Sequence, residues 1–250
     1  MTRFIATLAA ILAFAASTAQ AETGPIPDKR IVVTMDQDLA GQDLAQLFDT
    51  TFEACRAACE SDAACTAFTF NSRSNACFPK TAVTGSSDYE GAQSARVIAA
   101  TQEARTLAAT RVGDLEFLGT ATLPSAHDLA RQIGWIHPGG KFTLQTMIDA
   151  ARDRRASGNM LDAMRWTGGA VAASDASDLW AEYARLLLIV APQDNQNRRT
   201  YTRRALSAAA NAYLRASTDP ARVNALTALA DALLANRRGR DTIPALRFAE

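Results

Sequence analysis

The sequence FEACRAACESDAACTAFTFNSRSNACFPK, residues 52–80, contains all four cysteines of this 250-residue chain and decides its fold. Cys55 and Cys59 lie four residues apart in a run rich in Ala, Glu and Arg, which places them on one face of a short helix. The aromatic and β-branched run at residues 66–70 predicts a strand, and a polar turn then leads into a return strand at 76–80. The stretch therefore predicts a helix followed by a hairpin.

The expected hairpin limits where its side chains lie. If the chain turns about Arg73, Cys77 lies opposite Thr69 and shares a face with it and with Cys65 and Ala67. The phenylalanines at positions 68, 70 and 78 then share the opposite face.

The four cysteines can pair in three ways. A bridge from Cys55 to Cys59 would crowd one helical turn, whereas Cys59 and Cys65 are separated by a short loop and are natural partners. That choice leaves Cys55 for Cys77. A zinc site with four thiolate ligands is the alternative, but the spacings lack the close C-x2-C pairs of structural zinc sites.

The first 21 residues are predicted to be a secretory signal peptide. Arg3 supplies the positive charge, residues 4–16 form an apolar segment, and Ala19-Gln20-Ala21 is an A-x-A cleavage site before Glu22. The apolar run is short for a membrane span. The mature chain is therefore expected to be periplasmic or secreted, where disulfides persist.

Charge is balanced overall but uneven along the chain. Residues 28–98 carry 10 acidic and 6 basic side chains, and residues 99–250 carry 15 acidic and 19 basic ones. Neither half is basic enough to indicate a nucleic-acid partner. Arginine pairs at 154–155, 198–199, 203–204 and 237–238 are interpreted as solvated helix faces. The alternative is a docking surface for the acidic N-terminal domain.

Residues 22–98 are predicted to form the first domain, with strands at 30–35 and 93–99 and a loop at 81–91. The segment DQDLAGQDL at 36–44 looks like a calcium loop, but Ala40 and Leu47 stand where an EF-hand needs oxygen ligands. A polar turn is therefore expected there. A domain of about 70 residues has a thin core and benefits from disulfides.

The run EACRAACESDAACTAFTFNSRSNACFPK at 53–80 resembles a PAN/apple domain. This family has two cysteines on a short helix, a third before an aromatic strand and a fourth after a turn. The resemblance implies a small sheet curled around one helix, the pairs Cys55–Cys77 and Cys59–Cys65, and a module that binds proteins or glycans without catalysis. The third bridge of many apple domains has no cysteines here.

Residues 99–141 are interpreted as a connector with two candidate helices, 101–111 and 125–133, the second beginning at Ser125. Both histidines, His127 and His137, fall in it. No cysteine or tight acidic cluster lies beside them, so neither a metal site nor a cofactor is expected.

From residue 142 to residue 250 the chain is rich in Ala, and its predicted helices come in pairs. The pairs are 142–157 with 160–173, 177–190 with 196–216, and 220–236 with 240–249. With starts near 143, 177 and 220, their first helices begin 34 and 43 residues apart, a period that predicts a solenoid of tetratricopeptide type. The expected fold is a small disulfide-stapled α+β PAN/apple domain followed by an all-α helical-repeat domain.

The sequence contains no catalytic motif such as G-x-S-x-G, H-E-x-x-H or a glycine-rich phosphate loop. Gly168 and Gly169 lie within a predicted helix, where close helix packing accounts for them. Oxidised cysteines cannot act as nucleophiles. We therefore expect no enzymatic activity.

The order of an exported apple-like module and an Ala-rich helical segment resembles the N-terminal region of bacterial alpha-2-macroglobulin family proteins. The motifs that carry this resemblance are DLAGQDL at 38–44, FDTTFEAC at 48–55, FTFNSRSNACFPK at 68–80 and RGRDTIPALR at 238–247. Those proteins trap proteases through a bait segment and a thioester. The chain has no C-x-E-Q thioester, so the resemblance implies a recognition and spacer region, with a helical segment that is truncated.

Two functions are therefore expected. The first is a non-catalytic exported recognition and spacer region of an alpha-2-macroglobulin-like protease inhibitor, joined to downstream domains. The second is a free-standing periplasmic adaptor that binds a protein or glycan through its apple domain. In both, the two halves are expected to be separable, with residues 24–98 folding alone once oxidised.

Overall fold

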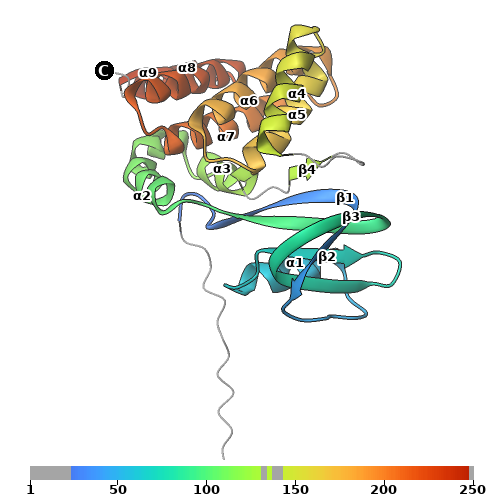
Figure 1. Cartoon of the computed structure of the whole chain (residues 1–250). Coiled ribbons are helices and arrows are strands. Elements are labelled where there is room, and N and C mark those ends of the chain that lie inside the picture. Colours follow the sequence, from blue (N-terminus) through green and yellow to red (C-terminus); the bar gives the residue numbers. More distant parts are fainter. Residues whose placement is uncertain (1–23, 131–133, 137–142, 248–250) are drawn as a thin grey trace, which may run out of the picture.

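The computed structural model describes residues 24–130, 134–136 and 143–247, which form a small β-domain beneath a larger helical region (Figure 1). The predicted signal peptide and His137 lie outside the described residues. The fold class agrees with the expectation from the sequence, because a small sheet-containing domain with two disulfides precedes a bundle of helices.

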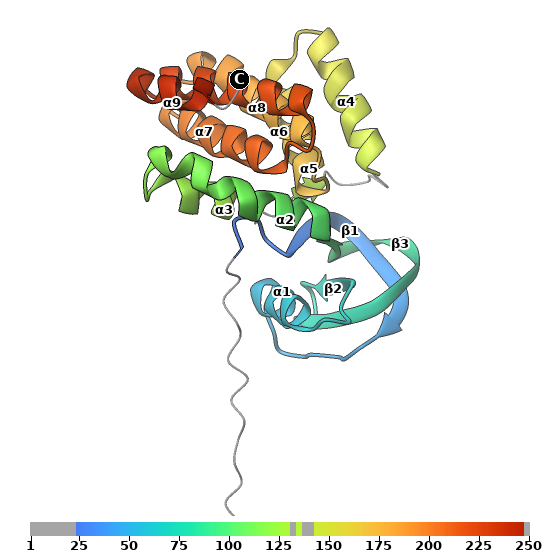
Figure 2. The same cartoon turned by 90° about the vertical axis from the view of Figure 1, so that its left-hand side faces the viewer.

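The β-domain is built on a long antiparallel ribbon of two strands, β1 (Lys29–Asp43) and β3 (Ala76–Ala99). A short strand, β2 (Ala67–Asn71), pairs with both ends of β3, so that Phe68 faces Pro79 on one side and Ala95 on the other. The ribbon is therefore folded back so that its two ends flank β2, which gives the curl seen in Figure 2.

The ribbon bends at a bulge around Asp36, which has a φ of 54°. The pairing register shifts between Met35 and Gln37, and Asp36 Oδ1 accepts a hydrogen bond of 2.9 Å from the backbone N–H of Gly91. The prediction of a turn at 36–44 and a loop at 81–91 was wrong. Both polar segments form strands because they pair with each other across the ribbon. The backbone N–H and C=O groups of each segment find their hydrogen-bond partners in the other.

The cysteine helix, α1 (Phe52–Ser61), lies against the curled sheet as the sequence predicts. The side chain of Thr51 caps it by accepting a hydrogen bond of 3.2 Å from Ala54 N. Its buried face carries Phe52 and two cysteines, which pack with strand residues into the core of the β-domain.

The hairpin after α1 has a register one residue away from the predicted one. Phe70 pairs with Cys77 and Thr69 pairs with Phe78. The side chain of Asn71 accepts hydrogen bonds from the backbone of residues 73 and 74. The turn occupies residues 72–75, so it is centred between Arg73 and Ser74 and not on Arg73. Because a slip of one residue exchanges the faces of the return strand relative to β2, Cys77 lies with Phe68 and Phe70 in the core. Phe78 lies instead on the side of Thr69.

Eight α-helices follow the β-domain in the described part of the chain. They are α2 (Gln102–Arg111), α3 (Thr122–Ala130), α4 (Leu144–Ala156), α5 (Met160–Ala172), α6 (Ser177–Val190), α7 (Arg198–Arg215), α8 (Asp219–Ala235) and α9 (Thr242–Arg247), with 3-10 turns at Val112–Leu118, Ala191–Gln193 and Gly239–Asp241. The three predicted helix pairs are confirmed as α4 with α5, α6 with α7, and α8 with α9.

The segment predicted as a connector is helical over most of its described length and belongs to the helical core. Helices α2 and α3 both pack on α7, and Ala108, Leu115 and Ala126 are buried in the same cluster as the later helices. Helix α3 begins at Thr122, so Ser125 lies inside it and is not its cap. The helical region therefore starts near residue 102.

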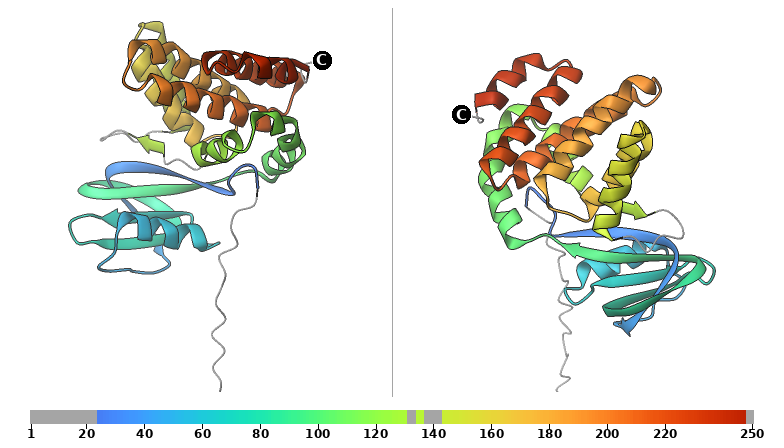
Figure 3. Two further views of the ribbon diagram at one scale, coloured as in Figure 1. Left: turned by 180° about the vertical axis from the view of Figure 1, so that it is seen from behind. Right: turned by 45° about the horizontal axis from the view of Figure 1, so that its top comes forward.

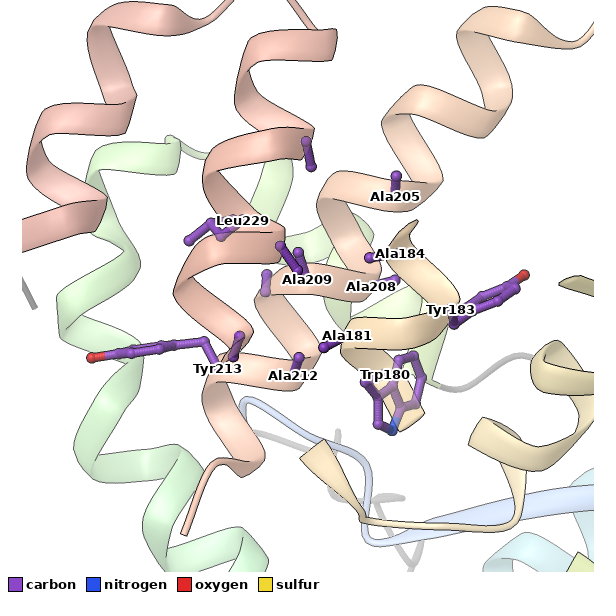
Figure 4. Close-up of a cluster of buried hydrophobic side chains, with 14 of the residues drawn as sticks. Trp180, Ala181, Tyr183, Ala184, Ala205, Ala208, Ala209, Ala212, Tyr213 and Leu229 are labelled. Atoms are coloured by element: carbon purple, nitrogen blue, oxygen red, sulfur yellow. The ribbon is translucent and has the colours of Figure 1, made fainter. Parts of the chain in front are cut away.

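Alanine dominates the core between helices α6, α7 and α8 (Figure 4). Ala181 and Ala184 of α6 face Ala208 and Ala212 of α7, all of them fully buried, and Trp180 closes the end of the cluster nearest the β-domain. Small side chains let the helix backbones approach closely. Gly168 in α5 serves the same purpose, because a Cβ there would lie 3.3 Å from the ring of Tyr183.

A short strand after α3, β4 (Gly134–Ile136), pairs in parallel with β1. The sheet order is thus β2-β3-β1-β4, and one strand of the sheet comes from outside the first domain. This shared sheet argues against the expectation that the two halves are separable.

Candidate functional site: a hollow on the β-domain and a buried joint

Two disulfides hold the β-domain together. One joins Cys55 of α1 to Cys77 of β3, and the other joins Cys59 at the end of α1 to Cys65 before β2. Their Cα atoms lie 5.5 and 5.2 Å apart, within the usual range for a disulfide. These are the nested pairs that the PAN/apple resemblance implies, and they attach α1 to both strands of the hairpin.

The face of the sheet away from the cysteines contains a hollow of about 320 Å³. It is formed where β2 meets the polar halves of β1 and β3. The side chains that line it are Asp38, Asp43, Thr69, Asn71, Phe78, Lys80, Tyr89 and Ala92.

The floor of the hollow is fixed by hydrogen bonds among three strands. Thr69 of β2 lies 2.7 Å from the hydroxyl of Ser94 in β3, and it accepts a hydrogen bond of 3.1 Å from Leu39 N in β1. Both hydroxyls are buried. A floor fully satisfied in this way is rigid and presents the hollow in one shape.

The hollow has an unbalanced negative charge. The buried Lys80 places Nζ 2.5 Å from Asp43 Oδ1 and neutralises it. The carboxylate of Asp38 makes no hydrogen bond or ion pair within the described residues. One carboxylate therefore remains available to a ligand.

Aromatic rings form the rim beside this carboxylate. Phe78 packs edge to face against Phe48, with ring centroids 6.4 Å apart, and Phe48 is 64% exposed. Tyr89 is 44% exposed. Exposed aromatic side chains next to a few polar groups are the usual composition of a binding site.

The sequence did not reveal this site, because its residues come from three strands that only the bend of the ribbon brings together. The predicted register also placed Phe78 on the same face as the core phenylalanines, whereas the structure places it beside Thr69. The spacing of Phe78 and Lys80 on one strand face was the available signal.

A second polar cluster joins the β-domain to the helical region. Arg30 of β1 is 1% exposed and donates hydrogen bonds to the carbonyls of Val171 and Ser174, at 3.3 and 2.6 Å. Its other terminal nitrogen lies 3.0 Å from Asp175 Oδ1. The same oxygen accepts a hydrogen bond of 3.2 Å from Arg215 Nε. We call the set Arg30, Asp175 and Arg215 the buried joint.

Burial determines the electrostatics of the buried joint. It lowers the pKa of Arg215 to about 10, an effect that the nearby charge of Arg30 reinforces and that of Asp175 opposes. Burial likewise lowers the pKa of Arg30, and Asp175 opposes the shift. Both guanidinium groups remain charged at neutral pH, and Arg215 also lies over the ring of Trp180, 4.8 Å from its centroid. Among the described residues, Asp175 is the carboxylate that pairs with both of these buried cations.

Residues 24–130, 134–136 and 143–247 contain no group of three or more His, Cys, Asp or Glu side chains placed to hold a metal ion. Within those ranges no helix is both long and apolar enough to cross a membrane. His127 lies in α3 without such neighbours.

The fold and the hollow define a class of protein, a small disulfide-stapled binding module carried on a helical region. Residues 31–102 match the family model of the PAN domain. The match includes all four cysteines and every side chain that lines the hollow. No curated protein and no solved structure matches the chain. PAN domains are non-catalytic modules that bind proteins or carbohydrates.

Proposed function

We propose that this chain is an exported, non-catalytic recognition protein whose PAN domain binds its ligand in the hollow beside Asp38. The observation that carries the proposal is the combination of one unpaired carboxylate with the rings of Phe78 and Tyr89 in a single hollow. The disulfides support an oxidising location, either periplasmic or outside the cell.

The charge of the hollow favours a protein ligand that presents a basic side chain. Lys80 neutralises Asp43, so the hollow keeps the negative charge of Asp38. A lysine or arginine side chain of a ligand would pair with this carboxylate and lie against an aromatic face. A neutral glycan would use the same rings but would leave Asp38 without a charged partner.

The test is binding of the mature, oxidised chain to an array of Lys- and Arg-containing peptides and of neutral oligosaccharides. Replacing Asp38 by Asn is expected to weaken peptide binding roughly 10- to 100-fold, because a hydrogen bond to a charged group contributes about 1.5–3 kcal/mol. Glu53→Gln, on the exposed side of α1, is the matched control and should bind as the parent does. Unchanged binding by Asp38→Asn would overturn the site, and binding to oligosaccharides alone would replace the protein ligand by a glycan.

The sequence leads to two expectations for the kind of protein to which this site belongs. A recognition and spacer region of an alpha-2-macroglobulin-like protease inhibitor and a free-standing periplasmic adaptor would both use this hollow. The inhibitor form rests on the sequence resemblance. A reading frame that continues into many β-sandwich domains supports it, and a stop codon directly after Glu250 supports the adaptor. In both forms the chain alone should neither cleave nor trap a protease.

A further inference from the structure

The helical region has a strongly basic end. Residues 194–204 and 231–241 contain seven arginines and three aspartates. The two segments are neighbours in space, because the side chain of Asn236 donates a hydrogen bond of 2.8 Å to the carbonyl of Thr202. We call these two segments the arginine end.

Five arginines of this end are exposed, and their guanidinium groups make no hydrogen bond or ion pair within the described residues. They are Arg198, Arg199 and Arg203 of α7 and Arg237 and Arg240 after α8. Asp194, Asp231, Asp241 and the nearby Glu116 offset four of the seven positive charges, so the arginine end keeps a net charge of +3. Asp241 pairs with Arg238, Asp194 accepts hydrogen bonds from Asn197, and Asp231 and the nearby Glu116 are exposed.

The other exposed arginine group shows the contrast. In α4, Arg152 pairs with Asp149 at 2.8 Å and Arg155 pairs with Glu182 at 3.0 Å. Those charges are largely balanced on the surface of the helix. The five exposed arginines of the arginine end lack such partners, and the first turn of α7 contains no acidic residue to offset its positive helix dipole.

Large aliphatic side chains are exposed beside these arginines. Leu234, near the end of α8, is 60% exposed, and Ile243, at the start of α9, is 61% exposed. A Cβ on Gly239 would lie 3.6 Å from Leu234, which places this leucine against the turn that carries Arg240. Aliphatic and guanidinium groups together characterise surfaces that enter the headgroup layer of a membrane.

The β-domain of the same chain cannot cover this surface. Helix α7 has 18 residues, so about 25 Å separates Arg198 from Arg215 in the buried joint. Helix α8 returns from the joint toward the same end, and Figure 3 shows α8 and α9 on the side of the helical region away from the β-domain. Docking of the acidic domain on the arginine pairs at 198–199 and 237–238 is therefore not possible within one molecule.

We propose that the arginine end binds a surface of anionic phospholipid headgroups, with Leu234 and Ile243 inserted among them. The arginines supply attraction to the lipid phosphates and the aliphatic side chains supply contact with the acyl boundary. Binding of this kind holds the protein at the membrane without a spanning helix. It leaves the hollow of the PAN domain on the far side, available to a ligand.

The experiment is cosedimentation of the mature chain with vesicles of phosphatidylcholine, with and without one quarter phosphatidylglycerol. Binding is expected only with phosphatidylglycerol and should weaken as salt is raised. Each basic residue near an anionic surface contributes roughly a fivefold change in partition. The variant Arg198→Gln/Arg199→Gln/Arg203→Gln should therefore bind about 100-fold more weakly.

The matched control is Arg152→Gln/Arg154→Gln/Arg155→Gln, which removes the same charge from exposed positions of α4. It should retain binding within a few fold. Circular dichroism would verify that both variants keep their helices. Equal loss in the control, equal binding to phosphatidylcholine alone, or binding to soluble polyglutamate but not to vesicles would each overturn the proposal.

Discussion

The β-domain and the helical region are stabilised in different ways. Four of the ten residues buried in the core of the β-domain are half-cystines. In the main helical cluster, 16 of the 33 buried residues are alanine, and no disulfide lies in that part of the described chain. A small sheet encloses too few apolar side chains to be stable by burial alone, so covalent links reduce the entropy of its unfolded state. The helices instead gain stability from close approach over a long interface.

The two regions should therefore differ in what damages them. The β-domain depends on links that can be removed, whereas the alanine core has no room for larger side chains. Between them, the buried joint depends on charge balance. Substitutions in the disulfides, in the alanine core and in the buried joint can separate these three mechanisms. The loss of stability is expected to be largest in the buried joint.

The largest loss is expected from Asp175→Ala. This change leaves Arg30 and Arg215 buried without the carboxylate that balances them. Breaking a buried pair by removing one partner costs about 3–5 kcal/mol. Urea denaturation measures the loss. Asp162→Asn removes the charge of the exposed pair with Arg165 and keeps a side-chain oxygen for the hydrogen bond from Asn159 Nδ2, so it should cost less than about 1 kcal/mol. Equal effects of the two changes would show that the halves do not depend on the joint.

The second-largest loss of stability is expected from removal of a disulfide. Cys55 and Cys77 are 22 residues apart, whereas Cys59 and Cys65 are six apart. The chain-entropy relation gives about 3 kcal/mol for the longer loop and about 2 kcal/mol for the shorter one. The double variant Cys55→Ala/Cys77→Ala should therefore unfold at lower urea than Cys59→Ala/Cys65→Ala. The reverse order would show that strain, and not loop length, governs this domain.

Overpacking should break the alanine core. Ala209 in α7 is fully buried, so Ala209→Leu must displace its neighbours at a cost of about 1–3 kcal/mol. Ala156→Leu, at an exposed position in α4, adds the same atoms without that cost. Thermal unfolding followed by circular dichroism compares the two variants. A stable Ala209→Leu variant would mean that the helices are packed more loosely than the structure shows.

The smallest effect is expected at the cap of α1. Thr51→Ala removes the hydroxyl that accepts a hydrogen bond from Ala54 and should cost about 1 kcal/mol. Thr51→Ser keeps that hydroxyl and should behave as the parent in the same urea titration. If Thr51→Ala cost as much as loss of the Cys55–Cys77 bridge, covalent attachment would not be the main support of α1.

Much of the helical region could be predicted from the sequence, since its helices depend on local signals. The boundaries of the paired helices were predicted to within a few residues. The signals were the breaks at Gly158 and after Asn236 and the helical spacing of apolar residues such as Trp180 and Tyr183. Packing of α2 and α3 on α7 could not be predicted in the same way. It depends on contacts such as Asn211 to the carbonyl of Ala126, which lie 85 residues apart in the chain.

The β-domain was harder to predict. The cysteine spacing indicated α1 and the hairpin, but the polar strands around Asp38 and Tyr89 carry no alternation of apolar residues. Their structure depends on pairing with one another, and the four-residue turn after Asn71 moved the register by one. The hollow depends on both features. The buried joint was missed because an Arg in a strand and an Asp before a helix carry no signal that they meet.

The nested disulfides also determine how much length the chain can release when it is pulled. An extended residue spans at most about 3.6 Å, so the sequence separation of 22 between Cys55 and Cys77 corresponds to at most about 80 Å of contour length. While the bridge is intact, tension passes from Cys55 to Cys77 through the sulfurs. The segment between the two cysteines therefore carries no tension and is not extended. Reduction would release it, so an external thiol would convert a short, stiff connection into a long, compliant one.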